Sequence, residues 1–234
     1  MRLDKFLCSK GTRSEIRKLL KSGAVTVNGE VVKDSGFQVA PDCTAVMCRG
    51  ERVIYKSFIY LVMNKPQGYI SATRDKKLPV VTDLIGEEYR RFEPYPVGRL
   101  DIDTEGLLLL TNDGELAHEL TSPKKDVCKR YMAVTDIPMD KADSDAFSAG
   151  MEFSDFTAKP ARLEFTDDPN TVFITISEGK FHQVKRMCGK CGKHVTFLKR
   201  VAIGGLELKE DLALGAVYEL TKEELIEQIY KKEF

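Results

Sequence analysis

The stretch Gly98 to Gly114, GRLDIDTEGLLLLTNDG, joins an acidic loop directly to a run of four leucines. Three carboxylates, Asp101, Asp103 and Glu105, fall within five residues, and Leu107–Leu110 follow at once. An unbroken apolar run of this kind predicts a strand that is buried on both faces. The acidic loop should therefore open directly into the core of its domain.

Three interpretations of this loop compete. The six residues DIDTEG from Asp101 copy the opening of an EF-hand calcium loop, but its twelfth position is Asn112 rather than Glu, and residues 107–111 offer a calcium ion almost no side-chain oxygen. The second interpretation is a polar turn that caps a core strand. The third is a catalytic carboxylate at the base of a cleft, kept ionised by Arg99. Residue chemistry disfavours calcium and leaves the other two open.

The composition is that of an ordinary globular protein. The 234 residues are 42% apolar and 31% charged, and the length suits one large domain with a small one, or two modest domains. No apolar run approaches 18 residues and no signal-peptide pattern follows Met1. We therefore expect a cytoplasmic protein.

The net charge of zero conceals an uneven distribution of charge. Residues 1–56 hold 11 Lys and Arg against six Asp and Glu, so the remainder carries an equal excess of negative charge. A basic head on an acidic body suggests that the head binds a polyanion, although many solvated helices have a similar charge.

The first 50 residues predict a small module of two helices and a hairpin. A short helix is expected over Arg2–Ser9, and the capping box of Thr12 and Glu15 begins a second helix that ends at Gly23. The segment AVTVNGEVV then predicts a hairpin that turns at Asn28-Gly29. The basic side chains of the two helices lie off their apolar stripes, as a solvated face or as phosphate contacts; they are Arg2, Lys5, Arg13, Arg17, Lys18 and Lys21.

The rest of the chain alternates strand and helix signals. A buried strand is expected over Phe58–Met63, followed by a turn at residues 64–68. Helices are predicted at residues 115–120 and 139–149, and another should run from near His182 to Gly192.

The cysteines predict reduced thiols rather than a metal site. Only Cys188 and Cys191 form a CxxC pair, and no second pair or histidine spacing completes a zinc site. Helical spacing with Val184 and Met187 places both thiols on an apolar face. The other four cysteines are scattered: Cys8, Cys43, Cys48 and Cys128.

Four motifs, in order, resemble those of one enzyme family. MRLDKFL, the basic second helix and the V-x-V-N-G hairpin resemble the S4 RNA-binding domain. GRLDIDTEG resembles the catalytic motif of the pseudouridine synthases, in the RsuA branch that includes a small-subunit ribosomal RNA enzyme. Lys129-x-Tyr131 resembles the second motif of that family, and EGKFHQVKRM at residues 178–187 resembles the third.

The resemblance implies an α+β fold and a site within it. It places an S4-like module with its linker at residues 1–57 and a catalytic domain at 58–234, with a mixed, mostly antiparallel sheet and a central cleft. It assigns the nucleophilic aspartate to Asp101 and base stacking to Tyr131, and it leaves open whether Lys185 or Arg186 pairs with Asp101. The substrate-binding residues that it implies are Arg99, Lys65, Lys129, His182 and Gln183, with Arg2, Lys5, Arg13, Arg17 and Lys18 on the S4-like module.

The implied reaction converts one uridine of small-subunit ribosomal RNA to pseudouridine. No cofactor and no metal are needed, and we expect a monomer. The alternatives are a large-subunit rRNA enzyme or a non-catalytic, RNA-binding ribosome-assembly factor on the same fold. A glycoside hydrolase would also use paired carboxylates, but it would leave the S4-like module unexplained.

Overall fold

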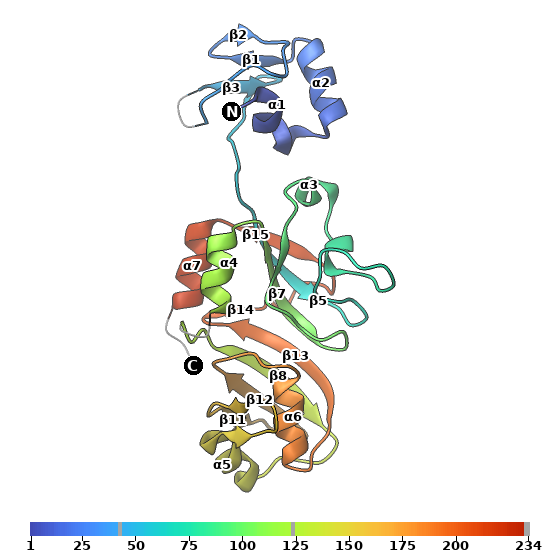
Figure 1. Ribbon diagram of the computed structural model, residues 1–234, viewed down its shortest axis with the longest axis vertical. Helices are drawn as coiled ribbons and strands as arrows, with labels where there is room; N and C mark the ends of the chain where they lie inside the picture. Colours follow the sequence, from blue (N-terminus) through green and yellow to red (C-terminus); the bar gives the residue numbers. More distant parts are fainter. Residues whose placement is uncertain (42–43, 123–124, 232–234) are drawn as a thin grey trace. The chain divides into compact units, whose positions relative to one another are not determined.

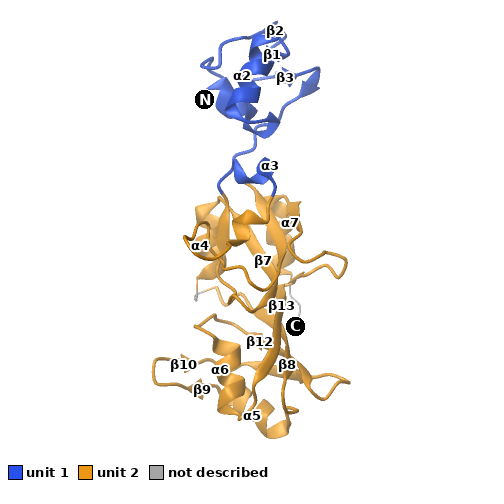
Figure 2. Ribbon diagram, turned by 90° about the vertical axis from the view of Figure 1, so that its right-hand side faces the viewer, with its two compact units in different colours: residues 1–58, 86–93 blue, residues 59–85, 94–234 orange. Residues whose placement is uncertain are grey.

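The computed structural model describes residues 1–41, 44–122 and 125–231, so Cys43 lies outside the described residues. The chain forms two compact units (Figure 2), one of residues 1–58 and 86–93 and the other of residues 59–85 and 94–234. The sequence predicted a domain boundary after residue 57. It did not predict that residues 86–93 belong to the first unit. None of the described helices is long and apolar enough to cross a membrane.

The first unit packs helical turns against a small sheet. Helix α1, Leu3–Phe6, continues as the 3-10 turn η1, Leu7–Lys10, so the helix predicted over Arg2–Ser9 is shorter than expected. Helix α2, Arg13–Lys21, begins with the predicted capping box. The predicted hairpin is also confirmed. The sheet order is β2-β1-β3-β4, with bounds β1 Val25–Val27, β2 Glu30–Val31, β3 Val46–Cys48 and β4 Glu51–Arg52.

The core of the first unit separates its apolar and basic faces. Leu3, Phe6, Ile16 and Leu20 are at most 2% exposed and pack together under the sheet. The basic residues of α1 and α2 remain exposed. Segment 86–93 carries helix α3, Glu87–Arg90, and is held to this unit by Arg91, whose guanidinium donates a hydrogen bond of 2.6 Å to the carbonyl of Cys8.

The second unit is built on one mixed sheet (Figure 1), with the order β11-β12-β8-β13-β7-β5-β15. Among the described pairs only β13 with β7 is parallel, so the predicted mixed, mostly antiparallel sheet is confirmed. The bounds are β5 Tyr60–Lys65, β7 Glu105–Thr111, β8 Lys129–Thr135, β11 Arg162–Phe165, β12 Thr171–Ile176, β13 Val195–Ile203 and β15 Val217–Leu220. Short strands β6 Tyr95–Val97 and β14 Leu206–Glu207 pair with β7 and β13.

Helices cover this sheet at its two ends. Helices α4, Gly114–Thr121, and α7, Lys222–Tyr230, lie side by side (Figure 1) and bury leucines and isoleucines against β5 and β7. Helices α5, Lys141–Ala149, and α6, Gln183–Lys190, lie at the end that carries β8, β11 and β12. The remaining elements are the 3-10 turn η2 Val81–Asp83 and the pair β9 Met151–Glu152 and β10 Thr157–Ala158.

Two of the central strands position the acidic loop. The four leucines of β7 are at most 2% exposed, which confirms the strand predicted from their run. Strand β5 pairs with β7 through Lys65, opposite Gly106, so the turn predicted from residue 64 begins later than expected. Phe58, predicted to be buried in this strand, lies before it and is 46% exposed.

Candidate active site

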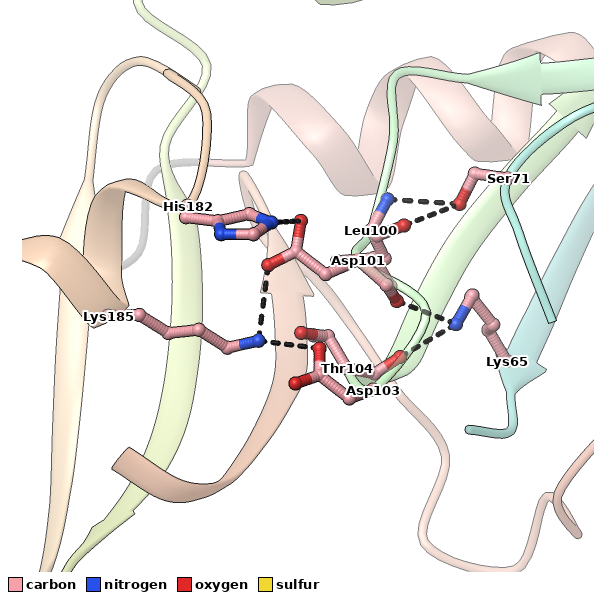
Figure 3. Close-up of polar contacts among 8 residues, drawn as sticks. All are labelled: Lys65, Ser71, Leu100, Asp101, Asp103, Thr104, His182 and Lys185. Atoms are coloured by element: carbon pink, nitrogen blue, oxygen red, sulfur yellow. Dashed lines mark hydrogen bonds and ion pairs between the residues drawn. The ribbon is translucent and has the colours of Figure 1, made fainter. Parts of the chain in front are cut away.

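The acidic loop between β6 and β7 is fixed by backbone and side-chain hydrogen bonds (Figure 3). The amide of Thr104 donates to the carbonyl of Asp101 at 3.1 Å, which closes a tight turn. The hydroxyl of Ser71 bonds both the amide and the carbonyl of Leu100 at 3.0 Å. Residues on both sides of Asp101 are therefore held, and its side chain points out of a rigid turn.

Lys65 lies beneath this turn and corrects one prediction. It is 0% exposed, and its ammonium donates to the carbonyls of Pro66, Asp101 and Thr104 at 3.1, 2.9 and 2.9 Å. Burial lowers the pKa of Lys65 to about 8. The nearby carboxylates act in the opposite direction, but their effect on the pKa is smaller. The prediction that Lys65 binds substrate is wrong, because a buried ammonium enclosed by three carbonyls cannot reach a phosphate of the RNA. Its role is to hold the loop.

Asp101 lies between two cationic or ionisable side chains of the third motif. The ammonium of Lys185 is 3.3 Å from one carboxylate oxygen, and Nε2 of His182 is 3.5 Å from the other. The Asp101 side chain is 26% exposed, so it remains accessible to a ligand. A cation at this distance stabilises an ionised carboxylate. In the described part of the chain, Lys185 therefore takes the role next to Asp101 that was predicted for Arg99, and Arg99 is exposed.

Arg186 does not contact Asp101. Its guanidinium binds both carboxylate oxygens of Asp155, at 2.5 and 3.0 Å, and lies over the rings of Phe153 and Phe156. The sequence left open whether Lys185 or Arg186 pairs with Asp101, and in the structure it is Lys185. The prediction of Arg186 as a catalytic residue is wrong.

Asp103 shares the ammonium of Lys185 with Asp101. The distance from its carboxylate to the ammonium is 2.5 Å, and this hydrogen bond lowers the pKa of Asp103. Asp103 is 63% exposed, so the ion pair is solvated and weak, at most about 1 kcal/mol. The pairing of Asp103 with Lys185 favours a role in shaping the loop rather than that of a second catalytic carboxylate.

Three neighbouring strands form the floor beside Asp101. Arg200 of β13 lies opposite Tyr131 of β8 and opposite Gly106 of β7. A Cβ at position 106 would overlap the carbonyl of Arg200, and Gly106 has φ of +106°, so only glycine permits this approach of the strands. Directly paired residues of neighbouring antiparallel strands point to the same face, which places the Tyr131 and Arg200 side chains together.

A pocket of about 240 Å³ opens at this floor, next to Asp101. Tyr131 is 8% exposed and contributes one wall. Lys129 also lines the pocket, and its pKa is lowered by burial and by the charge of Arg200. The predicted residues that line the pocket are Arg99, Asp101, Lys129, Tyr131, His182, Gln183 and Lys185.

The third motif shapes the opposite wall of the pocket. Gln183 is 3% exposed and donates to the carboxylate of Glu178 at 3.0 Å, so it braces the loop before α6. His182 has a left-handed φ of +50°, and its ring stacks on the exposed ring of Phe181 at 3.8 Å between centroids. Gln183 is a buried brace, whereas His182 faces Asp101 at the rim.

Sequence reasoning missed Arg200, Glu178 and Thr104 as pocket residues. Arg200 lies in the strand HVTFLKR, where no local pattern distinguishes a buried arginine from a solvated one. Its position opposite Tyr131 arises from pairing between strands that are far apart in the sequence. The basic residues Arg2, Lys5, Arg13, Arg17 and Lys18 belong to the first unit, where Arg2 is paired with Asp4 at 2.7 Å.

Within the described residues, no group of three or more His, Cys, Asp or Glu side chains is arranged to hold a metal ion. Cys188 is buried, as predicted, and burial raises the pKa of its thiol to about 12. Cys191 is only partly buried, which corrects the prediction of two buried thiols, because it is the C-cap of α6 rather than part of its apolar face.

Comparison with known proteins finds a matching family for each of the two units. The model of a family described as RNA pseudouridylate synthase matches residues 59–190, and that of the S4 domain matches residues 1–42. An uncharacterized RNA pseudouridine synthase of Bacillus subtilis is 47% identical over 96% of this chain and 97% of its own. The ribosomal small subunit pseudouridine synthase A of Escherichia coli K12 is 37% identical, with 96% and 98% covered. A crystal structure of a pseudouridylate synthase matches with a TM-score of 0.68 and 35% identity, over 98% of this chain and 99% of that one.

Proposed function

Because the chain belongs to the RNA pseudouridylate synthase family and carries an S4 domain, we propose that it converts one uridine of small-subunit ribosomal RNA to pseudouridine. The relatives named as small-subunit enzymes cover nearly the full length of both chains, which supports this substrate over large-subunit RNA. The prediction of a cytoplasmic monomer stays a prediction.

The observation that carries the proposal is the pairing of Asp101 with Lys185 beside the Tyr131 wall of the pocket. Asp101 lies 3.3 Å from the ammonium of Lys185, is accessible and is held on a rigid turn, as a group that reacts at a sugar must be. Tyr131 presents a ring to a planar base in the same pocket. This arrangement fits one flipped nucleotide, whose extrusion from folded RNA costs a few kcal/mol.

The reaction then follows from the geometry. Asp101 either attacks C1′ of the ribose or removes a proton from the sugar, and in both cases the N1–C1′ bond breaks with its electron pair on N1. The uracil turns while Tyr131 stacks on it, and C5 bonds to C1′. In the first route the bond between Asp101 and C1′ breaks in this step, and in the second Asp101 returns the proton to the sugar. C5 releases its proton and N1 takes one, so no oxidant, reductant or transferred group is consumed.

The first unit supplies affinity for RNA. Its exposed cations on α1 and α2 suit phosphate contacts, which give affinity without reading sequence. Arg99 and Lys129, at the pocket, are the proposed contacts to the backbone of the flipped nucleotide. His182 is the proposed rim contact, and Gln183 acts by bracing the loop.

The test is pseudouridine mapping in unmodified small-subunit rRNA, free and with bound ribosomal proteins. Wild type should convert one uridine, and Asp101→Asn should convert none while it still binds. The control is Asp145→Asn, which changes an exposed carboxylate of α5 that forms an ion pair with Lys141, and it should keep full activity. Conversion confined to large-subunit rRNA would overturn the substrate, and binding without conversion of either RNA would establish a non-catalytic assembly factor.

A further inference from the structure

The pocket contains a buried cation that the reaction described above does not use. Arg200 is 4% exposed, and its Nε donates to the carbonyl of Leu107 at 2.8 Å. Its Nη2 has no hydrogen-bond partner within the described residues. A buried, unsatisfied donor costs about 1 to 3 kcal/mol, and more when it is charged, so its retention points to a ligand.

A second unpartnered atom belongs to another residue that lines the same pocket. The hydroxyl of Thr104 belongs to a residue that is 1% exposed, and it also lacks a partner among the described contacts. Of the buried side-chain atoms described as unsatisfied, those of Thr104 and Arg200 are the two whose residues line the pocket beside Asp101. Two residues that line the pocket thus each carry a buried polar atom without a hydrogen-bond partner among the described residues, and one of these atoms belongs to a cation.

The chemistry of the proposed reaction identifies the partner of the cation. When the N1–C1′ bond breaks, the electron pair stays on N1, and the detached uracil carries a negative charge spread over N1 and its two carbonyl oxygens. A preorganised donor in a dry pocket stabilises such a charge far more than the neutral base. Arg200 is the strand neighbour of Tyr131, on the same face, where the base stacks.

We propose that Nη2 of Arg200 donates to a carbonyl oxygen of the uracil and stabilises the anion formed when the base detaches. This rests on the proposed function. The contribution should appear in the chemical step rather than in RNA affinity, because the charge exists only after the bond begins to break. Arg200 would then act on the base, while Asp101 acts on the sugar.

Two variants separate this role from structural support. In Arg200→Gln the side-chain amide nitrogen occupies the place of Nε, so it can still donate to Leu107, but the charge and Nη2 are lost. In Arg200→Lys the charge is kept. Under single turnover with saturating enzyme, Arg200→Gln should be slower by about 100-fold or more, with RNA affinity within threefold of wild type. Arg200→Lys should recover part of this loss, and thermal unfolding of both variants reports any loss of fold.

Thio-substituted RNA tests the contact itself. Sulfur is a weaker acceptor than oxygen, so 2-thiouridine or 4-thiouridine at the target position should slow wild type at one of the two positions. In Arg200→Gln and Arg200→Lys the hydrogen bond from Nη2 to the uracil is already absent or altered. The same thio substitution should therefore change the rates of these two variants little, whatever the stability of their fold. Thio effects that are equal in all three proteins, or an Arg200→Gln rate within threefold of wild type, would overturn the inference. Failure of wild type to convert any uridine would instead overturn the proposed function.

Discussion

At the scale of residues, two adjacent cations of α6 have different partners. Successive residues of a helix point roughly 100° apart, so Lys185 faces Asp101 while Arg186 faces Asp155 and the ring of Phe153. The motif in the sequence predicted that one cation would pair with the aspartate. It could not tell which, because the choice depends on how α6 is rotated against the sheet.

The difference between these two cations can be measured. Lys185→Met removes the cation that stabilises ionised Asp101, and the rate of pseudouridine formation should fall about 100-fold or more. Arg186→Met should change the rate less than about threefold, because its exposed ion pair lies away from the pocket. Equal losses in the two variants would contradict this assignment.

The pKa of Asp103 depends on its contact with the ammonium of Lys185 and can be used to test that contact. Its hydrogen bond with Lys185 lowers the pKa of Asp103 below the ordinary 3.8, so this carboxyl contributes stability above pH 3.8 that is lost as the pH falls through the lower folded value. In Lys185→Met the pKa should return toward 3.8 in an NMR titration of the aspartate carboxyls. An unchanged pKa would show that the contact is absent in solution.

At the scale of elements, strand contacts set the shape of the site. The leucine run predicted β7 correctly, because burial on both faces leaves a clear pattern. The role of Lys65 was missed because a lysine next to proline looks like a turn residue, whereas pairing of β5 with β7 places it inside the sheet. Arg200 was missed for the same reason: its neighbours come from strands distant in the sequence.

The approach of β13 to β7 predicts a large effect of one methyl group. Gly106→Ala would force a Cβ into the carbonyl of Arg200 at a positive φ, and we expect a loss of more than about 3 kcal/mol in the free energy of unfolding. The matched control is Gly189→Ala in α6, where nothing lies within 4 Å and alanine should stabilise by about 0.5 to 1 kcal/mol. Urea unfolding measures both, and a tolerated Gly106→Ala would refute the close approach.

The ammonium of Lys65 predicts opposite effects of pH on stability and activity. Its pKa of about 8 lies below the ordinary 10.5, so between these values the unfolded chain binds more protons, and the contribution of Lys65 to stability rises with pH. The neutral amine, however, has two N–H donors for three carbonyls, so turnover should fall above about pH 8 as the loop loosens.

Replacement of Lys65 isolates both effects. Lys65→Met should cost about 2 kcal/mol or more, because the carbonyls of the loop lose their donor. The stability difference between wild type and Lys65→Met, followed by urea unfolding from pH 7 to 10, should grow toward high pH. A pH-independent difference, together with a flat rate profile through pH 8, would contradict the buried ammonium.

At the scale of the whole molecule, the division of charge matches the division into units. The S4 domain and the synthase family were both predictable, because their motifs are local runs of sequence that occur in a fixed order. The return of residues 86–93 to the first unit was not, since it depends on a contact between Arg91 and Cys8 that no local pattern encodes.

The basic face of the first unit predicts a salt-dependent loss of affinity. The triple variant Arg13→Ala, Arg17→Ala, Lys18→Ala should bind RNA more weakly at low salt, and its slope of log affinity against log salt should be smaller by roughly 2 to 3. The rate at saturating RNA should not change. Lys141→Ala, an exposed cation of the second unit, is the control, and an unaltered slope in the triple variant would exclude these phosphate contacts.

The central claim is that ionised Asp101 breaks the bond between uracil and ribose. The most direct measurement is release of tritium from C5 of labelled uridine in small-subunit rRNA, under single turnover, by wild type and Asp101→Asn at equal RNA occupancy. We predict release of the tritium of one uridine by wild type and none above background by the variant. Release by Asp101→Asn at a rate near that of wild type would contradict the account.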